Sequence, residues 1–290
     1  LDTRWGFNWQ HSGIQGHWRY EADYSKVSDI GYFQSIDSNV GKREDNTLLQ
    51  TGEISYRGLD WNSTVRVRDF QALTEGTSVY RLMPQVDLNY YAPQVTDWLD
   101  VSVPAQLSVF ANDDPSKPEA TRTHLAPTLT MPFTRPWFNA TAEASMLYTH
   151  YDQRFDSAIQ DAESTATLNK SVDRKIPTLR LHSGLVLERN FWAMGGHFSQ
   201  TIEPQVQYLY IKDVDQGGIY NPVNFSGGGY DTARLQTDYY GLFRSNQFSS
   251  IDYINPANQL TYGATTRFYD GGYKERLNLS FGQIYYFDQP

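Results

Sequence analysis

A two-residue alternation of apolar and polar side chains recurs along most of this chain. In HFSQTIEPQVQYLYIKD (197–213), Ile202, Val206 and Tyr208 fall on one side, whereas Glu203 and Gln205 fall on the other. A period of two predicts a β-strand with one apolar and one polar face. A soluble sheet buries its apolar face, whereas a membrane barrel turns that face to lipid and keeps a polar lumen.

The same pattern predicts roughly a dozen strands of about 10 to 16 residues. Membrane strands need about 9–11 residues, and strands of globular proteins average about 5–6. The clearest repeats are HWRYEADYS (17–25), STVRVRD (63–69), FNATAEASMLY (138–148) and TLRLHSGLVLE (178–188). Their length favours membrane strands.

Short and long connections alternate between these strands. Short ones are expected near 13–17, 58–61, 93–97, 135–137, 191–195 and 270–273, and long ones near 28–47, 74–79, 112–120, 152–171 and 213–258. Outer-membrane barrels have short periplasmic turns and long outer loops. The sequence therefore predicts an all-β, antiparallel up-and-down transmembrane β-barrel wall of about 12 strands, with its apolar faces toward lipid.

The opposite strand faces carry charged side chains, and buried unpaired charges are costly. We therefore expect a wet lumen lined by Arg66, Arg68, Glu143, Arg180 and Glu203. The segment 213–258 is too long for an idle loop. We expect it to be folded, either capping the barrel or entering its lumen.

Composition narrows the function classes. The 15% aromatic content suits membrane girdles, although soluble carbohydrate-binding β proteins are also rich in aromatic residues. A net charge of −9 argues against nucleic acid as a partner. Cysteine is absent, which excludes disulfides and Cys-bound zinc. No apolar run reaches the roughly 18 residues of a membrane helix.

No motif predicts catalysis, a cofactor or a metal. His197 and Ser199 share a strand face, but a hydrolase dyad there would face the lumen, away from lipid esters. The six histidines are scattered, and GGGYD (227–231) does not join a strand to a helix as a phosphate-binding loop does. Asp113 and Asp114 lie in a polar loop, where solvation or divalent-bridged contact with headgroups is expected.

Five prolines fall inside predicted strands: Pro84, Pro104, Pro127, Pro177 and Pro204. Proline removes a hydrogen bond from the ladder and normally lies at edges or bulges. We expect local bulging, with deliberately weakened strand pairing as the alternative.

Several long stretches closely resemble the LptD family of LPS-assembly outer-membrane proteins. They are TIEPQVQYLYIKD (201–213), the segment 235–270 beginning LQTDYYGLFRSNQFSS, and ERLNLSFGQIYYF (275–287). MPQVDLNYY (83–91), EATRTHLAPTLTMP (119–132) and YSKVSDIGYFQSID (24–37) fit the same family, so the resemblance covers essentially the whole chain.

The resemblance implies a protein in which a periplasmic jellyroll receives lipopolysaccharide (LPS) from bridge proteins. A barrel of roughly 26 strands then passes it to the outer leaflet around a lipoprotein plug, LptE. On this view residues 1–290 are a segment of the outer-membrane barrel domain. They lack the jellyroll, its cysteines and the C-terminal strands, so the lateral gate lies outside them.

We therefore expect a non-enzymatic LPS translocon component in the Gram-negative outer membrane. Contact with the plug is expected at the first long loop, at Asp29, Tyr32, Phe33 and Asp37. The rivals are a closed 12-stranded outer-membrane pore or lipid hydrolase, and a soluble carbohydrate-binding protein. The N-terminus has no signal peptide and begins almost inside a strand, which suggests a piece of a longer chain.

Overall fold

The computed structural model describes residues 3–38, 40–41, 46–76, 78–155, 168–193, 195–220 and 229–288. These residues form one antiparallel sheet with two single-turn helices, α1 (Tyr32–Ser35) and the 3₁₀ helix η1 (Tyr240–Phe243). In the described ranges, no helix is long and apolar enough to cross a membrane. The predicted all-β class is confirmed.

The sheet contains 14 strand segments. They are β1 (Gly6–Gln15), β2 (Trp18–Val27), β3 (Thr47–Arg57), β4 (Trp61–Ala72), β5 (Arg81–Thr96), β6 (Leu99–Ala111), β7 (Glu119–Leu125), β8 (Thr128–Arg135), β9 (Phe138–Arg154), β10 (Ser171–Leu185), β11 (Leu187–Ala193), β12 (Gly196–Ile211), β13 (Ala257–Asp270) and β14 (Glu275–Tyr286).

Apart from two broken strands, each strand pairs with the strands beside it in the sequence, so the sheet is an up-and-down meander. β7 and β8 both lie between β6 and β9, and together they act as one broken strand. β10 and β11 likewise both pair with β12. Counting each broken strand once gives the dozen strands predicted from the sequence.

The prolines have different local effects. Pro127 lies at the break between β7 and β8, and the β5–β6 register shifts between Leu82 and Gln85, around Pro84. Pro104 lies opposite the β7–β8 break and Pro204 opposite the β10–β11 break, whereas Pro177 lies in continuous pairing. The expected local irregularity is therefore found at, or directly opposite, four of the five prolines.

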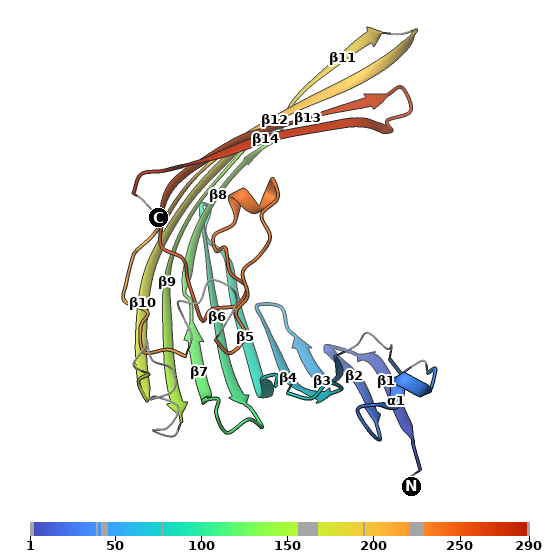
Figure 1. Ribbon diagram of the computed structural model, residues 1–290. Helices are drawn as coiled ribbons and strands as arrows, with labels where there is room; N and C mark the ends of the chain where they lie inside the picture. Colours follow the sequence, from blue (N-terminus) through green and yellow to red (C-terminus); the bar gives the residue numbers. More distant parts are fainter. Residues whose placement is uncertain are drawn as a thin grey trace.

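Short turns lie at one end of the sheet and long connections at the other, as the loop alternation predicted. The sheet is strongly curved, and the β12–β13 connection (orange in Figure 1) lies on its concave side. This connection, residues 212–256, is called the covering segment below; its residues 221–228 lie outside the described ranges, as does part of the predicted GGGYD motif.

Candidate functional site on the concave face

The two faces of the sheet are inverted relative to a soluble protein. Apolar side chains on the convex face remain uncovered; Leu88, Leu181 and Val206 are 44%, 43% and 40% exposed. The concave face carries the charged residues and receives the covering segment. An exposed apolar surface of this extent marks an interaction surface.

Tryptophan marks the short-turn end of the sheet. Five tryptophans at or beside the short turns have exposed side chains: Trp18, Trp61, Trp98, Trp137 and Trp192. Such amphipathic rings form the girdle of a membrane barrel. Their recurrence at successive short turns is visible in the sequence, and our sequence reasoning missed it.

Four of the five predicted lumen residues make ion pairs across the concave face. Arg66 pairs with Glu53 at 2.7 Å, Arg180 with Glu143 at 2.7 Å, and Glu203 with Arg267 at 3.3 Å. All six side chains remain partly exposed, consistent with a wet surface. Arg68 lies on the same strand face as Arg66 by alternation.

The covering segment is anchored by Arg122 of β7, whose side chain is fully buried. Its Nη1 donates to Asp252 Oδ1 at 2.5 Å and to Asp231 Oδ1 at 2.7 Å, and its Nη2 donates to Asp231 Oδ2 at 2.7 Å. Charge-assisted bonds of this kind are the strongest polar contacts in proteins. The Arg122 guanidinium therefore joins two parts of the covering segment, at Asp231 and Asp252, to the sheet.

Arg174 of β10 provides a second anchor, mainly to backbone. Its Nη1 donates to the Asp252 carbonyl oxygen at 2.7 Å and to Gln216 Oε1 at 2.8 Å, and its Nη2 donates to the Ile251 carbonyl oxygen. Gln216 in turn donates to the Ile254 carbonyl oxygen at 2.8 Å. These bonds satisfy backbone groups that have no ladder partner.

Asp252 is the centre of this network and is 1% exposed. It also accepts from the Tyr151 hydroxyl at 2.9 Å and from the backbone N–H of Tyr230 at 2.8 Å. Burial alone would raise the pKa of Asp252, but the charge of Arg122 and hydrogen bonds from the Asp231 backbone N–H, Arg122 and Tyr151 hold it below its ordinary value. Burial, together with the neighbouring Asp252 charge, raises the pKa of Asp231.

Apolar contacts flank these anchors. Ile219 and Tyr230 of the segment pack with Phe110 and Tyr151 of the wall, and Ile254 packs with Ile176 and Leu209. The Gln153 side chain donates to the Gly218 carbonyl oxygen at 2.7 Å and accepts from the Tyr230 hydroxyl at 2.7 Å. The described residues of the segment are thus folded against the concave face, in agreement with the sequence expectation that it is folded.

The predicted loop residues are partly internal. Tyr32 and Phe33 are buried with Val27, Leu48 and Leu73. Asp29 accepts hydrogen bonds from Arg4 Nε at 2.9 Å and from the Ser28 hydroxyl at 2.8 Å. The Asp37 side chain is exposed. Contact of these four residues with a plug stays a prediction.

The hydrolase alternative gains nothing from the geometry. The Ser199 hydroxyl donates to Asn190 Oδ1 at 2.7 Å, and no bond joins it to His197 in the described structure. In the described ranges, no three His, Asp or Glu side chains are grouped so as to hold a metal. In the polar loop, Asp113 pairs with Arg81 at 2.6 Å, and Asp114 accepts from Ser116.

Comparison with known proteins agrees with this geometry. Residues 2–290 match the profile of the LptD family, described as LPS transport system D. Proteins named LPS-assembly protein LptD are 55% identical over 292 residues in Photobacterium profundum, 48% identical over 293 residues in Vibrio cholerae, and 40% identical over 289 residues in Salmonella typhimurium. The alignments cover 99–100% of this chain but 36% of each relative's length. The chain therefore belongs to the LptD family, whose named members are LPS-assembly proteins rather than enzymes.

Proposed function

We propose that this chain is a section of the wall of an outer-membrane β-barrel that passes LPS to the outer leaflet. The observation that carries the proposal is the inverted sheet, with an uncovered apolar convex face and a polar concave face. Lipid would cover the first, and the second would line a hydrated lumen. We infer that the cargo is LPS from family membership, because the relatives are named for LPS assembly.

Further strands are needed to close such a barrel. β1 and β14 each pair with one neighbour in the described sheet, and lipid cannot satisfy unpaired edges. We therefore assign residues 1–290 to part of a larger barrel, for which the family resemblance suggests roughly 26 strands. The periplasmic bridge would deliver LPS through a jellyroll elsewhere in the protein.

We also propose that the concave face surrounds a lipoprotein plug of the LptE type. Ion pairs such as Arg66–Glu53 and Arg180–Glu143 leave charged groups partly exposed there for a protein or saccharide surface. In the first long loop, Asp37 is an exposed contact candidate, whereas Tyr32 and Phe33 would act by shaping the loop. Asp29 would hold that loop through Arg4.

Photocrosslinking in cells tests the proposal. A photoreactive residue at Glu203 would face the lumen, whereas one at the neighbouring Ile202 would face lipid at the same depth. Adducts with LPS or the lipoprotein from position 203, and phospholipid adducts alone from 202, are expected. Equal adducts from both positions, or a water-soluble full-length protein, would reject the assignment of faces.

A further inference from the structure

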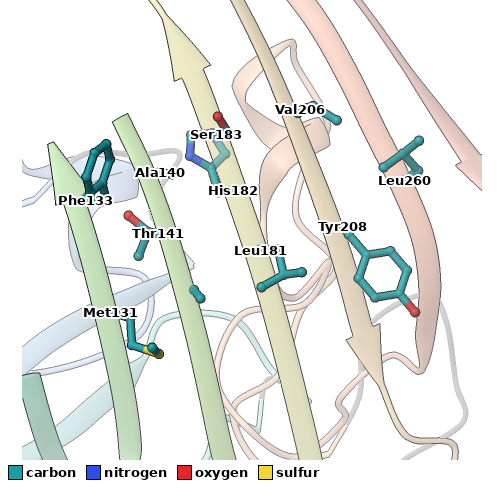
Figure 2. Close-up of a pocket in the computed structure, with 11 residues that line it drawn as sticks. Met131, Phe133, Ala140, Thr141, Leu181, His182, Ser183, Val206, Tyr208 and Leu260 are labelled. Atoms are coloured by element: carbon teal, nitrogen blue, oxygen red, sulfur yellow. The ribbon is translucent and has the colours of Figure 1, made fainter. Parts of the chain in front are cut away.

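An apolar groove crosses the convex face over β8, β9, β10, β12 and β13. Figure 2 shows its labelled side chains on these neighbouring strands. The groove is an open surface depression with a volume of about 390 Å³. Its convex-face lining residues are Met131, Phe133, Ala140, Ala142, Leu181, Ser183, Val206, Tyr208 and Leu260; Thr141 and His182 also border it but alternate toward the concave face.

Small side chains on β9 form the floor of this groove. Ala142 lies between Met131 of β8 and Leu181 of β10 in the ladder, and Ala140 lies between Phe133 and Ser183. Ala140 and Ala142 are smaller than Phe133 and Met131 on one side and Leu181 on the other, and this leaves a channel along β9. No Asp, Glu, Lys or Arg lines it, which favours an apolar occupant.

A cation lies at the short-turn end of the groove. The Arg135 guanidinium lies 4.6 Å from the Phe133 ring centroid, and its Nη1 donates to the Thr134 carbonyl oxygen at 3.0 Å. Arg135 is exposed and has no carboxylate partner among the residues that the structure describes. The Trp137 and Phe138 rings, 5.8 Å apart, lie beside it in the sequence. An unpaired guanidinium next to an apolar channel complements a lipid with an anionic phosphate and an acyl chain.

We propose that the groove binds one acyl chain of a glycerophospholipid, with the lipid phosphate against Arg135. This inference rests on the membrane location proposed above. Short turns of such barrels lie on the periplasmic side, so Arg135 would lie at the headgroups of the inner leaflet. That position favours a glycerophospholipid over LPS, whose destination is the outer leaflet.

Native mass spectrometry of the full-length protein, released from membranes in mild detergent, tests the site. The wild-type protein should retain one glycerophospholipid. Ala142→Phe should fill the groove and lower retention by about tenfold, equivalent to roughly 1.4 kcal/mol of binding. Ala22→Phe, on the convex face of β2 away from the groove, is the matched control and should retain the lipid.

Arg135→Gln provides a second test that leaves the apolar face intact. After delipidation, palmitoyl-oleoyl phosphatidylglycerol should rebind more weakly to this variant by about tenfold, and Arg135→Lys should recover part of the loss. Equal retention by wild type and both groove variants, or LPS as the retained lipid, would overturn the proposal. Surface LPS, measured in the same strains, separates this failure from failure of the transport function.

Discussion

Two sets of arginines on the same concave face have different surroundings. Arg122 and Arg174 are buried beneath the covering segment, where Asp231, Asp252 and backbone carbonyl oxygens accept their hydrogen bonds. Arg66 and Arg180 are partly exposed and pair with glutamates on adjacent strands. Strand alternation places all four on the polar face, but the covering segment decides which of them stabilise tertiary structure.

Removing the buried carboxylate is expected to have the largest effect. Asp252→Ala should weaken docking of the covering segment by about 3–5 kcal/mol, because it leaves Arg122 without one of its partners in a buried site. Hydrogen–deuterium exchange of residues 229–256 in the full-length protein measures this. Protection equal to wild type would show that the buried pair does not hold the segment.

A smaller effect is expected from one hydroxyl in the same region. Tyr230→Phe removes the donor to Gln153 Oε1 but leaves the Tyr220 N–H bound to that oxygen at 2.9 Å. We expect a loss of about 1 kcal/mol in exchange protection of the segment. Tyr262→Phe, which removes an exposed bond to Gln283, should change it much less and serves as the control.

The exposed arginine–glutamate pairs are expected to contribute much less to stability than the buried pair. Glu143→Gln removes the charge that faces Arg180, and the unfolding free energy should change by about 1 kcal/mol or less. Urea unfolding of the full-length protein in detergent measures the change. A loss comparable to that of Asp252→Ala would abolish the distinction between covered and uncovered arginines.

The smallest effect concerns pH. The Arg4 hydrogen bond, helped by Ser28, lowers the pKa of Asp29 from 3.8 to about 2. A depressed carboxyl pKa stabilises the folded loop above pH 3.8, and this contribution is lost as the pH falls through about 2. Pepsin cleavage within residues 28–38 should therefore rise as the pH is lowered from 3.8 to about 2. Asp29→Asn should remove this pH dependence of cleavage. If cleavage of the variant still rises with falling pH, a group other than Asp29 is responsible.

Local periodicity was sufficient to predict the strands, the polar face and the alternating connections. It also placed Arg66, Arg180 and Glu203 on one face, because a strand's two faces are fixed by its own alternation. The Arg122–Asp252 contact was not predictable, since 130 residues separate its partners and neither has a local signal. Burial of Tyr32 and Phe33 was missed for the same reason, because it depends on Leu48 and Leu73 across the loop.

The tryptophans at the short turns also provide an intrinsic fluorescent probe of depth in a bilayer. Five of the seven tryptophans in residues 1–290 lie at one end of the sheet, so a full-length variant that keeps only these seven would mainly report one level of the sheet by its fluorescence. Lipids carrying bromine at successive acyl positions would quench this emission most strongly at the level where the rings reside. A single optical titration would thus test the proposed membrane location and measure the depth of this end of the section.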